Sequence, residues 1–167
     1  MKVISIIRHA KAEIVDGDTA DFERALTERG RKDARALGKV IDTLKPPLEW
    51  IVSSAAKRAA QTSHELIKVL SEDPKLVLEG RIYGADVNTL LSVLTETPSG
   101  IEHAALVGHN PILEELISGL CCGDSHPFPV TLATATLAQI ELEIFSWDQL
   151  RWGCGRLNLL LPAKVVR

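Results

Sequence analysis

Two arginines and two histidines stand at positions where their side chains could bind and transfer an anionic group. Arg8 and His9 follow the apolar run 2–7, Arg58 lies shortly after the run 50–52, and His109 follows the run 104–107. Arginine presents forked N–H donors that match phosphate oxygens, and each charge-assisted bond contributes about 1.5–3 kcal/mol. A neutral histidine ring is a competent nucleophile near pH 7. These residue types predict a phosphate site in which His9 attacks phosphorus.

These four side chains can act together only if the fold brings the ends of three runs to one place. Each run is short and apolar, which is typical of a strand buried on both faces, and 76–78 is a further run of this kind. A helical pattern follows each of the four strands. The first of these helices is expected to be capped by Thr27, and the second to end near Leu70. The third is expected to be capped by Asp86 or Asn88, and the fourth by Asn110. Alternating strands and helices predict a parallel sheet whose carboxyl edge holds the ligand.

The last part of the chain has a different pattern. Apolar residues alternate with polar ones from Ala138 to Ile144, which is typical of a strand with one solvated face, and residues 156–161 are its expected partner. We therefore expect an α/β fold of three layers, α/β/α, with a mainly parallel central sheet and an antiparallel C-terminal strand pair.

Length and composition exclude several classes of protein. A chain of 167 residues is expected to form a single domain, 1–167. The net charge of −3 argues against a nucleic-acid partner. No apolar run is long enough for a membrane span or a signal peptide, so we expect a cytoplasmic protein with no membrane partner. The three cysteines have no zinc spacing, and we expect neither a metal nor a cofactor.

Four short motifs, in order along the chain, resemble those of the histidine phosphatase (phosphoglycerate mutase-like) superfamily. They are Arg8-His9-Ala10-Lys11, then 26–30 (Leu-Thr-Glu-Arg-Gly), Ser53-Ser54 followed by 58–62 (Arg-Ala-Ala-Gln-Thr), and 107–111 (Val-Gly-His-Asn-Pro). Within that superfamily the small size, the Arg-His-Ala-Lys start and the residues Arg24-Ala25-Leu26-Thr27 are similar to SixA-like phosphohistidine phosphatases.

The resemblance implies a role for each matching residue. His9 is expected to become phosphorylated, Arg8, Arg58 and His109 to complete the phosphate pocket, and Arg24 to be a supporting cation. Members that act on small phosphate esters have an acidic proton donor after the third strand. Glu79 stands nearest that place in this sequence. Asp86 is the next choice.

The implied function is that of a metal-independent phosphatase with a covalent phosphohistidine intermediate on His9. No cap domain fits between Thr62 and His109, so the preferred substrate is phosphohistidine on a protein, and inorganic phosphate is the product. Two alternatives stay open: a small-molecule phosphomonoesterase of the same superfamily, and a non-catalytic module that binds phosphate or a phosphoprotein. His64, His103 and His126 match no motif and are expected to be structural or solvated.

Overall fold

A computed structural model describes residues 1–17, 19–123 and 128–167. The described residues form one mixed sheet in the order β3-β2-β4-β1-β5-β6. The four strands of its first part run parallel to one another, and β5 is antiparallel to both β1 and β6. The bounds are β1 Lys2–Arg8, β2 Trp50–Ser54, β3 Lys75–Glu79, β4 His103–Gly108, β5 Thr136–Leu142 and β6 Gly155–Pro162.

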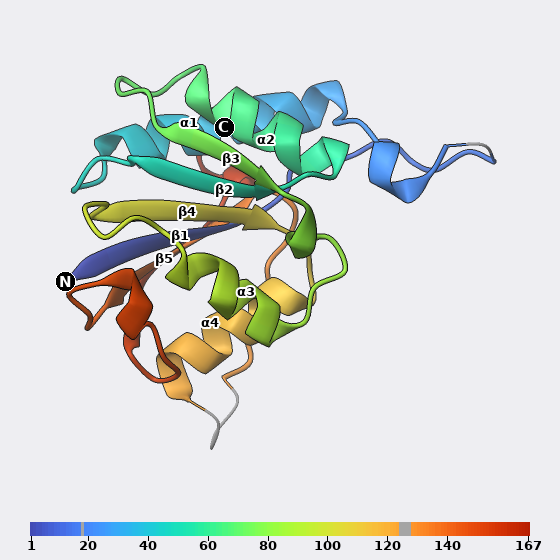
Figure 1. Cartoon of the computed structure of the whole chain (residues 1–167). Helices are drawn as coiled ribbons and strands as arrows, with labels where there is room; N and C mark the ends of the chain where they lie inside the picture. The colour runs from blue at the N-terminus through green and yellow to red at the C-terminus, as the bar shows by residue number, and fades with distance from the viewer. Residues whose placement is uncertain (18, 124–127) are drawn as a thin grey trace.

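Helices cover both faces of the sheet (Figure 1). One face carries α1 (Glu28–Thr43) and α2 (Lys57–Ile67), and the other carries α3 (Val87–Thr95) and α4 (Ile112–Cys122). Short 3-10 turns lie at Asp21–Glu23, Gly80–Ile82, Trp147–Gln149 and Ala163–Val165. The predicted three-layer α/β/α fold with an antiparallel C-terminal pair is confirmed.

The sheet separates two hydrophobic cores because successive side chains of a strand point to opposite faces. Ile4 and Ile6 pack toward α3 and α4, whereas Ile7 packs toward α1 and α2, and all three are fully buried. This burial on both faces is what the apolar run 2–7 predicts. Among the described residues, none of the helices is both long and apolar enough to cross a membrane.

Of two N-cap residues predicted from the sequence, Thr27 is confirmed and Asn110 is wrong. The Thr27 side chain accepts a hydrogen bond from the Gly30 N–H (2.9 Å) and caps α1, as expected. The prediction that Asn110 caps α4 is wrong, because the helix begins at Ile112 with Pro111 as its N-cap residue. The Asn110 side chain instead donates to Glu114 and to the Leu132 carbonyl, and it therefore serves the site rather than the helix end.

The two other histidines that the structure describes lie on different elements. His103 is fully buried, and its ring bonds the Ser5 hydroxyl (2.8 Å) and the Pro46 carbonyl (2.9 Å), which is a structural role. His64 is exposed on α2. His126 lies outside the described residues.

Candidate active site

The carboxyl ends of three neighbouring strands bring the predicted residues together. Arg8 pairs with Gly108 across β1 and β4, and the His9 N–H donates to the Gly108 carbonyl (3.0 Å). The rings of His9 and His109 consequently lie side by side, with centroids 5.2 Å apart. Parallel strands end at one edge of a sheet, and this explains how residues a hundred positions apart meet.

The ring of His9 is held in one orientation and one tautomer. Its Nδ1 donates to the Ala10 carbonyl oxygen (2.8 Å), so the neutral ring carries its lone pair on Nε2. Arg58 Nε approaches that Nε2 at 3.3 Å. The imidazole therefore presents a single basic nitrogen, and that nitrogen faces a cation.

The Arg58 guanidinium also holds a carboxylate that the sequence analysis did not single out. Its two terminal nitrogens donate to the main-chain oxygen of Asp21 (2.7 Å) and to the Asp21 carboxylate (3.0 Å). The same carboxylate accepts bonds from the Tyr83 hydroxyl (2.8 Å) and from Arg24 (3.0 Å). Arg24, predicted as a supporting cation, thus reaches Arg58 through Asp21.

Tyr83 links this carboxylate to the histidine pair. Its ring meets that of His109 edge-on, with centroids 5.7 Å apart, and Phe22 packs edge-on against its other side at 5.0 Å. The 3-10 turn Asp21–Glu23 and Tyr83 consequently lie over the end of the strands as one packed group.

His109 is oriented by the end of β2. Its Nε2 lies 2.8 Å from the Ser54 hydroxyl, which also accepts a bond from the Ala56 N–H (3.2 Å). When Ser54 donates its proton to Nε2, the neutral His109 carries its own proton on Nδ1. That Nδ1 is buried and has no hydrogen-bond partner among the described residues.

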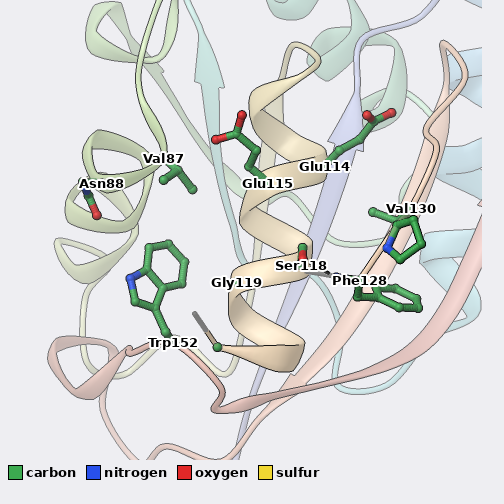
Figure 2. A pocket seen from close by; sticks show the side chains of 11 residues that line it. Val87, Asn88, Glu114, Glu115, Ser118, Gly119, Phe128, Val130 and Trp152 are labelled. Atoms are coloured by element: carbon green, nitrogen blue, oxygen red, sulfur yellow. Dashed lines mark hydrogen bonds between the residues drawn. The ribbon is translucent and has the colours of Figure 1, made fainter. Parts of the chain in front are cut away.

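Arg8 is anchored from the other side of the sheet. Its terminal nitrogen donates to the Leu132 carbonyl (2.7 Å), while its buried Nε has no partner in the described part of the chain. Glu114 fixes this segment, because its carboxylate accepts bonds from the Leu132 N–H (2.8 Å) and the Asn110 amide (2.7 Å). Figure 2 shows Glu114 on the side of α4 that faces Val130.

The groove in Figure 2 adjoins this cluster at Glu114, which lines it, and extends away from the histidine pair. It measures about 510 Å³ between α3, α4 and residues 128–130, and its lining includes Val87, Glu115 and Trp152. None of the predicted site residues lines it. The chemistry-bearing side chains are therefore gathered at the strand ends and not in this groove.

Other motif residues, which neither bind phosphate nor react, connect the motif segments by hydrogen bonds. The Thr62 hydroxyl accepts a bond from the Ala10 N–H (3.0 Å), and the Gln61 side chain accepts one from the Leu26 N–H (2.7 Å). The Thr27 N–H donates to the Lys11 carbonyl (2.9 Å). These bonds join the first three motifs in the folded chain.

The structure does not bring Glu79 or Asp86 into the cluster. Glu79 accepts two bonds from Arg81, from its N–H (2.9 Å) and its guanidinium (2.8 Å). Asp86 caps α3 by accepting a bond from the Thr89 N–H (2.8 Å). Asp21 is the acid that contacts the site, and its one signal in the sequence is that it stands three residues before Arg24. In a 3-10 turn this spacing puts two side chains on the same side.

The electrostatics keep both histidines neutral and Asp21 charged. Burial, with the nearby cations adding to it, lowers the pKa of His9 to about 3 and that of His109 to about 4. Hydrogen bonds from Tyr83 and then Arg24 lower the pKa of Asp21 to about 2. Near pH 7 the site therefore holds two neutral imidazoles, two arginines and one carboxylate.

No group of three or more His, Cys, Asp or Glu side chains in the described ranges is placed to hold a metal ion. Apart from the Asp21 carboxylate and the lone pair of His9 Nε2, the cluster offers cations and hydrogen-bond donors, which fit an oxyanion. The arrangement can bind phosphate oxygens and offer one nucleophilic nitrogen to phosphorus.

Comparison with known proteins shows which family this chain resembles. Residues 4–80 match the model of the histidine phosphatase superfamily (branch 1). The chain is 26% identical to the phosphohistidine phosphatase SixA of Escherichia coli (strain K12) over 165 residues, which covers 98% of this chain and 99% of that protein.

Solved structures show the same fold. A protein histidine phosphatase SixA complexed with tungstate superposes with a TM-score of 0.81 at 23% identity over 99% of both chains. A mycobacterial glucosyl-3-phosphoglycerate phosphatase with inorganic phosphate superposes with a TM-score of 0.65 at 17% identity, over 95% of this chain and 96% of the other. The chain therefore has the fold of these phosphatases, matches the histidine phosphatase superfamily model over residues 4–80 and is similar to SixA along its length.

Proposed function

We propose that the whole chain, 1–167, is one catalytic domain that removes phosphate from phosphohistidine on a protein, through a covalent intermediate on His9. The observation that carries this proposal is the fixed imidazole of His9: its Nδ1 is bound to the Ala10 carbonyl, and its Nε2 faces Arg58. A neutral, oriented ring beside cations is a nucleophile suited to phosphorus.

In the first step the phosphate displaces the Asp21 carboxylate from Arg58. Arg8 Nε and His109 Nδ1, two buried donors of the site that have no partner among the described residues, take phosphate oxygens. His9 Nε2 then bonds to phosphorus as the bond between phosphorus and the substrate nitrogen breaks. The departing histidine leaves as neutral imidazole when its other ring nitrogen already carries a proton.

In the second step water attacks the phosphorus of phosphorylated His9. We assign the Asp21 carboxylate, displaced from Arg58, as the group that takes the proton of this water, because the Tyr83 hydroxyl holds it beside the histidine pair. The bond between phosphorus and Nε2 breaks, and its electron pair returns to Nε2. The products are inorganic phosphate and neutral His9.

The state of Asp21 favours a nitrogen leaving group. An imidazole has an ordinary pKa near 6.5 and departs without help, whereas an alkoxide is a far stronger base and needs an acid. The pKa of Asp21 is held at about 2, so the carboxylate has no proton to give near pH 7. Glu79, the expected donor, is engaged by Arg81 instead.

Rapid-quench trapping tests the proposal. The protein is mixed with a protein carrying labelled phosphohistidine and quenched within milliseconds, and acid-labile, base-stable label is measured on the chain. We expect label on the wild type and none on His9→Ala. His64→Ala is the matched control, since that histidine is exposed on α2 and should leave the labelling unchanged.

Two results would overturn the proposal. Absence of both label and phosphate release in the wild type rejects the enzyme and supports a phosphate-binding module. Efficient turnover of sugar or nucleotide phosphates, with slow turnover of phosphohistidine, rejects the substrate and supports a small-molecule phosphatase.

A further inference from the structure

A cationic groove runs along α1 and away from the candidate active site. It measures about 850 Å³ and is lined by nine residues, of which five are basic and none is acidic. Four of the basic residues are on α1, and three of these, Arg29, Lys32 and Lys39, follow one another at intervals that keep them on one side of the helix. Apolar side chains, Val40 and Val166 among them, line the same hollow.

Two of the five charges of this groove are available to a partner, and Arg35 is paired with Glu65 at 2.6 Å. Lys32 and Lys39 are exposed and make no ion pair or hydrogen bond with any described residue. Arg29 and Arg167 share a single acid, Asp33, at 3.4 Å and 3.1 Å. Because the chain as a whole carries −3, this concentration of cations leaves the rest of the molecule more acidic than average.

The groove is continuous with the backbone that carries the nucleophile. A second, smaller hollow of about 240 Å³ shares Arg29 and Arg167 with it and is also lined by Lys11 and Lys164. Lys11 stands two residues after His9. Its carbonyl oxygen packs against the start of α1 so closely that a Cβ on Gly30 would meet it.

The other wall of the smaller hollow also leads to the site. It includes Ala133 and Thr134, and the residues on either side of this pair hold the catalytic strand end. The Leu132 carbonyl binds Arg8, and the Ala135 N–H donates to the His9 carbonyl (3.1 Å). A protein with its phosphorylated side chain in the site therefore lies over the near end of the groove.

We propose that this basic groove, from Lys11 along Arg29, Lys32 and Lys39, is the docking surface for an acidic face of the phosphoprotein substrate. The inference rests on the proposed function, since it concerns the partner of the same site. Cations around an apolar floor complement a protein surface that carries acidic side chains around apolar ones. A nucleic acid fits less well, because no aromatic side chain lines the groove for base stacking.

The test compares a protein substrate with a small one. The substrates are a phosphorylated histidine-phosphotransfer domain with an acidic surface, and phosphoramidate, which is too small to reach the groove. The variant is K32E/K39E, because neither lysine side chain makes a hydrogen bond or ion pair with any described residue. The matched control is R151E/R156E, which changes the net charge equally at two exposed positions outside both hollows.

We expect K32E/K39E to lower kcat/KM for the phosphorylated domain by about tenfold at low salt, and to flatten its salt dependence. Turnover of phosphoramidate should stay within about twofold of the wild type, as should both activities of the control. Equal losses in the two double variants, or wild-type turnover of the domain by K32E/K39E, would reject the docking surface.

Binding without turnover separates this inference from the proposed function. The affinity of the unphosphorylated acidic domain, and of a DNA duplex of similar charge, is measured by titration with both variants. If no phosphohistidine is hydrolysed by the wild type, but the domain binds and K32E/K39E weakens it, the docking surface stands and the proposed function fails. Binding of the duplex alone rejects the protein partner.

Discussion

Replacing Asp21 by asparagine should tighten the binding of inorganic phosphate and slow turnover. The substitution removes the charge that competes with phosphate for Arg58, while the main-chain oxygen of residue 21 keeps its bond to the guanidinium (2.7 Å). The Asp21 side chain is 47% exposed, so its ion pair with Arg58 is worth about 1 kcal/mol, which is about fivefold in phosphate affinity.

The same substitution removes the base assigned to the second step. General-base catalysis contributes about 10²-fold or more, so hydrolysis of the phosphoenzyme should slow by about that factor. The first step needs no proton from Asp21 and should proceed. We therefore expect phosphorylated His9 to accumulate during turnover.

Two measurements decide this prediction. Titration calorimetry gives the affinity for inorganic phosphate, and quenched samples give the fraction of labelled chain in the steady state. Asp16→Asn is the control, because it removes a charge from an exposed residue of the same loop. Weaker phosphate binding by Asp21→Asn would refute its role as a competitor, and unchanged turnover would refute its role as a base.

Three further predictions concern stability and the expected proton donor. The pKa values of His9 and His109 lie at about 3 and about 4 in the folded protein, against about 6.5 when unfolded, so the unfolded state binds more protons below pH 6.5. As the pH is lowered from 6.5 to 4, the free energy of unfolding should fall by about 1.4 kcal/mol per pH unit for each ring. His109→Asn should reduce the slope of this free energy against pH, as measured by unfolding in urea. Gly30→Ala should cost about 1–3 kcal/mol of stability, because its Cβ would overlap the Lys11 carbonyl oxygen, whereas a Cβ at Gly80 meets nothing within 4 Å. Thermal unfolding of Gly30→Ala and Gly80→Ala checks this, and equal stability of the two variants would contradict it. Glu79→Gln should leave kcat for phosphohistidine within about twofold, since its carboxylate binds Arg81; a loss of about 10² in steady-state assays would restore it as the donor.

Much of the fold is readable from the sequence because its signals are local. A β-branched run such as 2–7 indicates a strand, and the Thr27 hydroxyl caps a helix only a few residues away. The residues that end such strands, Arg8, His9 and His109, can be named as one cluster because parallel strands share a carboxyl edge. The apolar pattern locates the strands, and the shared carboxyl edge of parallel strands places these three residues together.

Other features depend on contacts between distant segments. The N-cap of α4 is Pro111 because the Asn110 amide is drawn to Leu132, a residue whose position no local pattern indicates. The loop before α1 has no periodicity, and the three-residue spacing of Asp21 from Arg24 is too weak a signal to choose Asp21 over Glu79 or Asp86. The tertiary structure decides which acid lies at the site, because only the folded chain brings Arg58, Arg24 and Tyr83 together around Asp21. Their cationic and hydroxyl groups stabilise the charged carboxylate there.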